Sequence, residues 1–274
     1  MNIFPNDKLT PELFHKFQKL AKDKCGVQVN DSKIVLVRTR MISICIKEKC
    51  DFSDLCTKLF AKENTDLMKM FIDKITTHET FLFRERNHFD FLKTQIYPSL
   101  KSKHIRIWSA AASTGEEAWS VSLHLKKYWK GKYQVIASDV SEVCLEQARR
   151  NNFMELRMRE VTPEEKVEFF DEVPPRNNLM PNTYKIKNSY MSPIKFFCHS
   201  LIDPLPKENG KFDIVFLRNV LIYFDGPTQK KIIKNVFDTM NDGAYLFLGH
   251  TESARDCIKN LKLVSPTIYK KVSV

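Results

Sequence analysis

From Ile105 onward, short apolar runs alternate with segments of helical periodicity. The apolar runs are "IRIWSA" (105–110), "YQVIASD" (133–139), "FDIVFLRN" (212–219) and "AYLFLGH" (244–250). The helical patterns that follow the first three cover residues 115–130, 141–151 and 226–240. Near-continuous apolar strands alternating with helices are typical of a parallel sheet that helices cover on both faces. We therefore expect an α/β domain in the second half of the chain.

Residues 10–75 lack such strands and have helical patterns throughout. Helix starts are recognisable from residues that favour the N-cap or the first turn. They are Thr10-Pro11, Asp31-Ser32, Asp51 with Ser53, and Asn64-Thr65. The short connections between these starts predict a small helical bundle.

Two further segments have a different character. Residues 76–100 are a polar turn followed by a Phe-rich helix that ends near Pro98. Residues 160–195 are rich in Pro and Asn and contain two short extended runs, 183–190 and 193–197. This second segment is typical of a small antiparallel subdomain inserted into the sheet domain. The predicted domains are thus a helical domain over 1–75, a linker helix over 76–100 and a sheet domain over 101–274.

The composition changes this picture little. The 274 residues are 43% hydrophobic and 28% charged, an ordinary globular composition. The chain has no apolar run of about 18 residues, as a membrane span needs, and its first residues lack the apolar core of a signal peptide. The seven cysteines are scattered, with no CxxC pair, which favours free thiols in a reducing cytoplasm. The seven histidines show no metal-ligand spacing, so no metal site is expected.

The net charge of +11 is uneven along the chain. Residues 1–49 contain ten Lys/Arg and five Asp/Glu, a local net charge of +5. Such an excess favours an acidic partner, which could be nucleic acid, anionic lipid or an acidic protein surface. A composition that is simply rich in lysine explains the charge equally well.

Candidate chemistry begins where the first strand ends, in "SAAASTGEE" (109–117). Ligands of doubly wound sheets bind at the carboxyl ends of the strands, and small residues let a ligand lie against the backbone. The stretch is neither a GxGxxG nor a P-loop, so a dinucleotide or triphosphate is not indicated. Glu117 has two interpretations, since Thr114 and Glu117 also fit a capping box.

A second carboxylate stands at the end of the next strand. Asp139 follows Gly115 by 24 residues, the place from which a carboxylate accepts hydrogen bonds from the two hydroxyls of a ribose. Asp139 could instead be an N-cap, with Glu142 three residues on. A small-residue turn and a carboxylate without phosphate-binding glycines suit a nucleoside without pyrophosphate, as in S-adenosylmethionine. Its amino group and sulfonium are cationic, which gives Glu117 a second role.

On these stretches the chain resembles the chemotaxis receptor glutamate methyltransferases. Four segments match in order, and they are "THETFLFRERNHF", "IRIWSAAASTGEEAWSVSL", "VIASDVSEVCLEQAR" and "FDIVFLRNVLIYFD…GAYLFLGHTES". The resemblance implies a Rossmann-like methyltransferase domain, an N-terminal helical domain and a small inserted antiparallel β-subdomain. It implies that S-adenosylmethionine is the methyl donor, S-adenosylhomocysteine the product, and glutamates of cytoplasmic chemoreceptor helices the acceptors.

The resemblance also implies site residues. Those implied to line the cofactor site are His78, Thr80, Arg84, Glu117, Asp139, Ser200, Leu201, Arg218 and Asn219. Arg84 and Tyr223 are implied to stand beside the transferring methyl group, as catalytic residues. The family usually has asparagine at the position of His78, and a neutral imidazole could still donate or accept one hydrogen bond there.

This chemistry fits the residue types. A glutamate acceptor, with an ordinary pKa of about 4.3, is already ionised at neutral pH, so no general base is required. The protein must supply positioning and exclusion of water. Arg84 could hold a carboxylate in two parallel hydrogen bonds, or it could be a surface partner of Glu85 or Asp90. Tyr223 could orient the acceptor, or it could be an aromatic core residue.

The basic N-terminal region gains a use from the same resemblance. Lys33, Arg40 and Lys47 are seven residues apart and share one helix face, whereas Arg38 lies about 200° away from Arg40. These four residues are the predicted receptor-binding residues, because a basic face would attract glutamate-rich helices. A solvated lysine face is the alternative. Charge reversal at Arg40 is expected to raise the KM for receptor and to leave cofactor affinity unchanged.

Two alternative functions stay open at this point. One keeps the fold and changes the acceptor to a nucleic acid or a small molecule, although the Asn-Pro-Pro-aromatic stretch typical of base methylation is absent. The other is a cofactor-binding signalling scaffold that has lost turnover. The preferred prediction is a bacterial cytoplasmic enzyme that acts on chemoreceptors, without nucleic acid as a partner and without direct insertion into the membrane.

Overall fold

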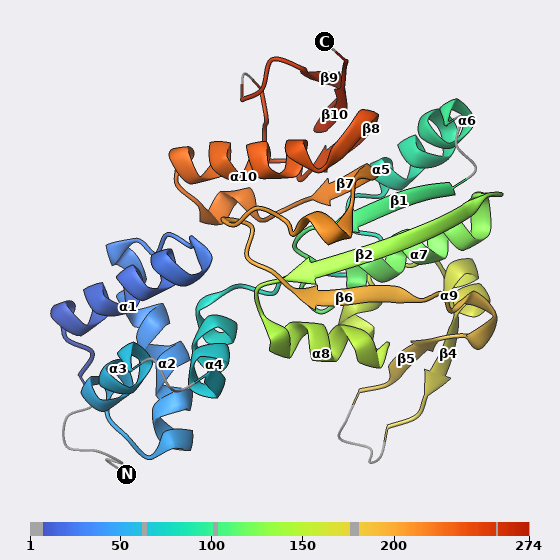
Figure 1. Cartoon of the computed structure of the whole chain (residues 1–274). Helices are drawn as coiled ribbons and strands as arrows, with labels where there is room; N and C mark the ends of the chain where they lie inside the picture. The colour runs from blue at the N-terminus through green and yellow to red at the C-terminus, as the bar shows by residue number, and fades with distance from the viewer. Residues whose placement is uncertain (1–7, 62–64, 101–103, 176–180, 256, 274) are drawn as a thin grey trace.

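The computed structural model describes residues 8–61, 65–100, 104–175, 181–255 and 257–273. Figure 1 shows a group of N-terminal helices beside a larger body built on a twisted sheet. The N-terminal helices are α1 (Pro11–Cys25), α2 (Ile34–Glu48), α3 (Phe52–Phe60) and α4 (Thr65–Ile75). They pack around a hydrophobic core of their own, which includes Phe14, Phe17, Met41, Leu55 and Phe71.

The helix starts follow the N-cap signals of the sequence in two of four cases. The hydroxyl of Thr10 accepts a hydrogen bond from the Leu13 N–H, and the Asp51 carboxylate accepts one from the Asp54 N–H. Asp31–Lys33 instead form a 3₁₀ turn that leads into α2. Helix α4 begins at Thr65, and the expected cap Asn64 lies outside the described residues.

The main sheet has seven strands in the order β6-β2-β1-β7-β8-β10-β9. The first five run parallel to one another, and β10 pairs antiparallel with both of its neighbours, β8 and β9. The bounds are β1 (His104–Ser109), β2 (Lys132–Asp139), β6 (Ile194–Cys198), β7 (Phe212–Leu217), β8 (Met240–Leu248), β9 (Leu261–Ser265) and β10 (Ile268–Lys271). The predicted α/β class is confirmed.

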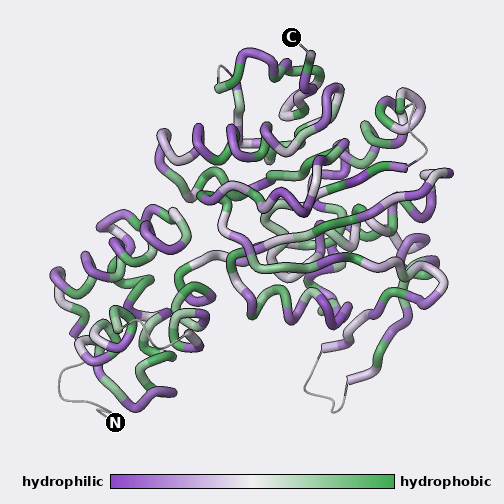
Figure 2. Tube along the Cα trace, viewed as in Figure 1, coloured by the Kyte–Doolittle hydropathy of each residue, from purple (hydrophilic) through white to green (hydrophobic). Residues whose placement is uncertain are grey.

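Helices cover both faces of this sheet. They are α5 (Arg86–Phe91), which continues through a π-helical turn (Leu92–Ile96) into α6 (Tyr97–Ser99), then α7 (Glu116–Tyr128), α8 (Glu142–Arg150) and α10 (Gly226–Asp238). Successive strand residues point to opposite faces, so Ile107 packs on the side of α5 and α7, whereas Trp108 packs on the side of α10. Figure 2 shows hydrophobic residues along the central strands. Because hydrophobic cores hold the sheet on both faces, the ends of its strands have fixed positions.

The small subdomain differs from the prediction in its strands. Its sheet has the order β3-β5-β4, with β3 (Phe153–Met154), β4 (Phe170–Val173) and β5 (Thr183–Ile186), next to α9 (Pro163–Phe169). The run 193–197 does not belong to it, because β6 pairs with β2 at the edge of the main sheet. Extended runs of similar length look alike in a sequence, and only the pairing partner separates them.

Beyond β8 the chain forms the β9–β10 hairpin, which completes the sheet and which the sequence patterns did not predict. Short 3₁₀ turns complete the description, at Glu155–Met158, Asn188–Tyr190, Lys207–Asn209 and Leu221–Tyr223. Among the described residues, no helix has the length and apolar character needed to cross a bilayer.

Candidate active site

A cavity of about 990 Å³, its open mouth included, lies where β1, β2 and β7 end. Part of its wall comes from the C-terminus of α1 and the segment 75–80 after α4. Every predicted cofactor or catalytic residue contributes to its lining, namely His78, Thr80, Arg84, Glu117, Asp139, Ser200, Leu201, Arg218, Asn219 and Tyr223. The structure therefore brings together residues that are up to 145 positions apart in the chain (223 − 78 = 145).

The turn between β1 and α7 brings backbone close to the cavity. Ser113 and Gly115 both have positive φ angles, of 50° and 95°. A Cβ atom at Gly115 would lie 2.6 Å from the Cβ of Ala148 on α8. Glycine is required here both for the left-handed backbone and for the contact with α8.

Glu117 lines the cavity and does not form the capping box. Helix α7 begins at Glu116 with Gly115 as N-cap, and no side chain makes the cap hydrogen bond. The Glu117 carboxylate instead accepts from the Ser109 hydroxyl at 2.7 Å and from Arg218 Nη1 at 3.1 Å. Burial raises the pKa of Glu117, against the lowering influence of Arg218. A nearby cation would therefore favour its ionised form.

Asp139 is buried where β2 ends, and its two oxygens accept from different backbone N–H groups. Oδ2 accepts from Ser113 at 2.8 Å and Oδ1 from Ser141 at 2.9 Å. The N-cap of α8 is Ser141, so the capping interpretation of Asp139 does not apply. Burial raises the pKa of Asp139 despite these two N–H donors. A carboxylate oxygen accepts more than one hydrogen bond, which leaves capacity for ligand hydroxyls.

Arg218 connects two carboxylates in the floor of the cavity. Its side chain is only 2% exposed, and it pairs with Glu117 at 3.1 Å and with Glu85 at 3.0 Å. Burial works to raise the pKa of Glu85, but Arg218, Asn219 and the His250 N–H outweigh it and hold the pKa below its usual value. With both carboxyls ionised, the cluster of Glu85, Glu117 and Arg218 has a net charge of −1, which suits a positively charged part of a ligand.

The sequence interpretation missed Glu85 as a structural partner of the site. It considered Glu85 only as a surface partner of Arg84, yet Glu85 is 9% exposed in its side chain and faces Arg218. Its backbone is left-handed, with a φ of 58°. The available signal was an acidic residue between two arginines in the Phe-rich stretch "FLFRERNHF".

Two buried hydroxyls support a polar ligand in this cavity. Ser113 Oγ and Ser200 Oγ both belong to lining residues, and neither has a hydrogen-bond partner among the described residues. Buried polar groups normally have partners, so these two fit contacts to a bound molecule. Carboxylates at two strand ends, unpartnered hydroxyls and small residues together fit the adenosyl and amino acid parts of S-adenosylmethionine.

Arg84 and Tyr223 stand on the lining as well. Arg84 Nη1 donates to the Glu79 carbonyl at 2.8 Å, and its guanidinium lies 5.5 Å from the centre of the Phe81 ring. Within the described residues, Arg84 forms no ion pair with Glu85 or Asp90. Tyr223 is half-buried and ends the 3₁₀ turn after β7.

The four basic residues of α2 and its start divide into two groups. Lys33, Arg38 and Lys47 are exposed, and Lys47 Nζ lies 3.1 Å from the sulfur of Met70. Arg40 is half-buried and donates to the carbonyls of Ile75 and Thr76, both at 3.1 Å, and to Thr77 Oγ1 at 3.2 Å. All three acceptor residues line the cavity. Arg40 therefore holds the cavity wall, which its sequence spacing did not reveal.

Two clusters of side chains that could bind a metal ion form in the structure, although the sequence predicted no metal site. Each has its ligand atoms within 4.8 Å of one another, and the groups are Asp73/His78/Cys144 and Glu85/His88/His250. In the first, His78 Nε2 is already hydrogen-bonded to the Asp73 carbonyl at 2.9 Å. In the second, the Arg218 cation against Glu85 disfavours a metal ion. We assign no metal to either group.

Comparison with known proteins agrees with this geometry. Residues 78–269 match the family model described as "CheR methyltransferase, SAM binding domain". A "Chemotaxis protein methyltransferase" of Borreliella burgdorferi is 30% identical over 97% of this chain and 96% of its own length. Proteins with the same description from Vibrio parahaemolyticus and Escherichia coli are 30% and 28% identical, over 93% of this chain and 94% and 89% of their own lengths.

Proposed function

Since the chain belongs to the CheR family of S-adenosylmethionine-dependent chemotaxis methyltransferases, we propose that it methylates glutamate side chains of methyl-accepting chemotaxis receptors. The products are glutamate methyl esters and S-adenosylhomocysteine. Chemotaxis protein methyltransferase activity itself follows from the family, and the proposal concerns the acceptor and the residues that act on it. A single cavity lined by Glu117, Asp139, Arg84 and Tyr223 is the observation that carries it.

For the cofactor, we assign the two carboxylates at the strand ends. Asp139 binds the ribose hydroxyls, and the group of Glu117, Arg218 and Glu85 faces the cationic amino acid part. The unpartnered hydroxyl of Ser200 and the side chains of His78, Thr80, Leu201 and Asn219 complete the contacts. When bound, S-adenosylmethionine supplies a methyl group that its positive sulfur has already activated.

For the acceptor, the protein contributes position and not a base. A glutamate carboxylate is ionised at neutral pH. The Arg84 guanidinium is held by one hydrogen bond to the Glu79 carbonyl, which leaves donors for two parallel bonds to a carboxylate. Tyr223 donates a hydrogen bond from its hydroxyl to the same carboxylate and sets its angle. In-line alignment of the reacting atoms at about 3–3.5 Å is the main source of rate in such a site.

The domains take separate roles in this proposal. Residues 1–75 face the receptor through exposed Lys33, Arg38 and Lys47, and Arg40 acts on the cavity wall. Residues 76–100 join the two parts and contribute Arg84, and residues 101–274 form the methyltransferase domain. Glutamate-rich receptor helices are the acidic partner, nucleic acid is not, and the protein works in the bacterial cytoplasm at receptor arrays without inserting into the membrane.

The test is a methyl-transfer assay with labelled S-adenosylmethionine and receptor-enriched bacterial membranes that lack their own methyltransferase. We expect label in receptor bands, and its release by base as volatile methanol identifies a carboxyl ester. Receptors with the acceptor glutamates changed to alanine are the matched control and should stay unlabelled.

Base-resistant label, or label in RNA or a small molecule, would assign a different acceptor to the same fold. Cofactor binding by calorimetry with no labelled product on any receptor would favour a scaffold without turnover. Either result overturns the proposal.

A further inference from the structure

The Glu252 carboxylate accepts four backbone hydrogen bonds beside the cavity. Oε1 accepts from the N–H groups of Val220 and Leu221, both at 2.7 Å. Oε2 accepts from Asn219 at 2.8 Å and from Gly249 at 2.7 Å. Glu252 is 7% exposed. All four lone-pair positions of the carboxylate are used inside the protein.

Three of these donors are consecutive in the chain. Asn219 has a left-handed φ of 56°, and Val220 a φ of −125°. Successive N–H groups that converge in this way form an anion-binding concavity, often used for phosphate. Here a carboxylate of the same chain fills it. This agrees with a cavity that fits a nucleoside without phosphates.

A second carboxylate holds the same loop from another direction. Asn219 Nδ2 donates to Glu85 Oε1 at 3.1 Å, and Arg218 Nη2 donates to Glu85 Oε2 at 3.0 Å. The His250 N–H also donates to Glu85 Oε1, at 3.2 Å. The loop after β7 and the end of β8 are therefore joined through two buried carboxylates.

The packing around Glu252 has no room for a larger residue at Gly249. A Cβ atom there would lie 2.5 Å from the Asn219 side-chain nitrogen Nδ2, 2.8 Å from the Asn219 backbone nitrogen and 2.9 Å from Glu252 Oε2. One added methyl group must therefore push the loop away from the carboxylate.

We propose that Glu252 is a positioning residue of the methyltransferase. It holds the loop 218–223 so that Asn219 faces the cofactor and Tyr223 faces the acceptor. The inference rests on the proposed roles of these two side chains, but not on which protein supplies the acceptor.

The test compares Glu252→Gln with the wild-type protein. The amide replaces one oxygen by a donor that faces N–H donors, so two of the four bonds are lost together with the charge. We expect affinity for S-adenosylhomocysteine, measured by calorimetry, to fall about tenfold or more, and kcat at saturating cofactor to fall by about 10- to 100-fold. Both measurements are made well below the melting temperature of each variant.

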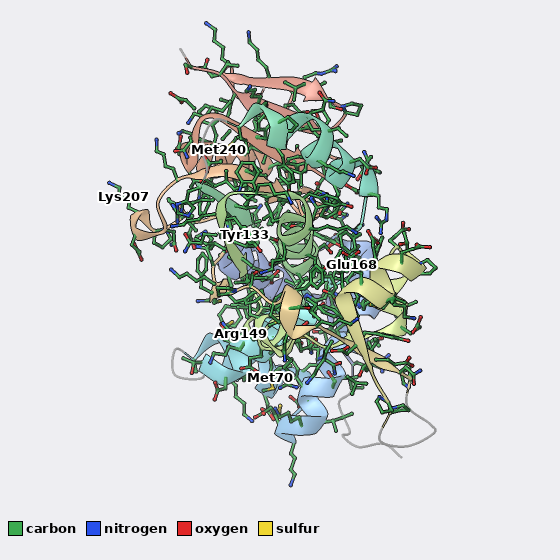
Figure 3. The ribbon with its side chains drawn as sticks, turned by 90° about the vertical axis from the view of Figure 1, so that its right-hand side faces the viewer. Met70, Tyr133, Arg149, Glu168, Lys207 and Met240 are labelled. Carbon is green, nitrogen blue, oxygen red and sulfur yellow. The ribbon has the colours of Figure 1, made fainter. Side chains whose placement is uncertain are left out.

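Two controls match the change. Glu168→Gln alters a carboxylate on α9 (Figure 3) that pairs with Lys127 and lies outside the cavity lining. We expect wild-type affinity and kcat for it. Gly249→Ala displaces the loop without touching the charge and should repeat the Glu252→Gln defects. Gly226→Ala is its control, because a Cβ there meets no atom within 4 Å.

A lower melting temperature with wild-type affinity and kcat would show a purely structural role for Glu252 and overturn the inference. If Glu252→Gln does not fold, Gly249→Ala decides, and wild-type kinetics for it overturn the inference equally. The proposed function fails in a different way, through a wild-type protein that binds S-adenosylhomocysteine but forms no receptor methyl ester.

Discussion

The two walls of the cavity are built in different ways. The sheet wall presents buried charged side chains at strand ends, and each one is held by hydrogen bonds to its neighbours, as in the Glu117–Arg218 pair at 3.1 Å. The opposite wall is the segment 75–80, which is neither helix nor strand beyond Ile75. Arginines hold this segment by its backbone carbonyls, Arg40 at Ile75 and Thr76, and Arg157 at His78 and Thr80.

This difference separates two tasks. Packing of the sheet on its helices fixes the carboxylates of the first wall, and we infer that this wall selects the charge of the ligand. The second wall depends on a few polar contacts from α2 and from the turn after β3, so it determines how closely the cavity is covered. Changes on the two walls should therefore give different kinetic effects.

The largest effect is expected where the two walls meet, at Arg84. Arg84→Ala removes the guanidinium that we propose aligns the acceptor, and misplacement of a reacting group costs about 100-fold in rate. We expect kcat to fall by about 100-fold or more, with the melting temperature and the affinity for S-adenosylhomocysteine changing much less. Turnover at the wild-type rate would remove Arg84 from the catalytic role.

A smaller effect is expected on the sheet wall at Tyr223. Tyr223→Phe removes one hydrogen bond in the transition state, which corresponds to about tenfold in kcat. Steady-state kinetics at saturating cofactor measure it. An unchanged kcat would show that the Tyr223 ring only packs.

The charge of the sheet wall can be tested through pH. Burial raises the pKa of both Glu117 and Asp139. Groups with raised pKa values take up protons at a higher pH than ordinary carboxyls. The ligand's ammonium group, which S-adenosylhomocysteine keeps, prefers the ionised form of Glu117, and the ribose hydroxyls donate to the ionised form of Asp139. Affinity for S-adenosylhomocysteine should therefore be full above these pKa values and should fall by several-fold as the pH is lowered from neutral towards about 4, where ordinary carboxyls titrate.

Calorimetry across this pH range measures that fall. Glu117→Gln, in which the amide stays neutral at every pH, should bind more weakly and show a flatter pH dependence. A wild-type affinity that does not change with pH would mean that neither carboxylate contacts the ligand in the proposed way.

The smallest effects are expected from the basic residues near the second wall. Arg40→Ala should lower the free energy of unfolding by about 1–3 kcal/mol, because three hydrogen bonds are lost. It should also weaken cofactor binding by a few-fold, which replaces the expectation that Arg40 affects only the receptor. Arg38→Ala, on an exposed residue, should raise only the KM for receptor, by about two- to threefold.

Chemical denaturation, calorimetry and receptor kinetics on both variants check this contrast. Equal effects of Arg40→Ala and Arg38→Ala on cofactor affinity would show that Arg40 has no special part in the wall.

Much of the fold could be predicted from local patterns. The β1 run and the helix after it are visible because near-continuous apolar residues give way to a helical period. Thr10 and Asp51 mark the starts of α1 and α3 in the sequence, because an N-cap side chain accepts a hydrogen bond from the first turn of its own helix. The position of Asp139 on the cavity lining could be expected because the carboxyl ends of parallel strands share one edge.

Pairings between distant segments could not be predicted in this way. The edge strand β6 and the β9–β10 hairpin look like other short extended runs, and their partners come from elsewhere in the chain. The contacts of Glu85, Arg40 and Glu252 could not be predicted for the same reason. Each of these side chains forms hydrogen bonds to groups that are 30 or more residues away in the sequence. The spacing of apolar residues along the sequence determines which face of each helix or strand is buried. The partner of a buried charge is determined only by the tertiary structure, because packing brings that partner in from a distant part of the chain.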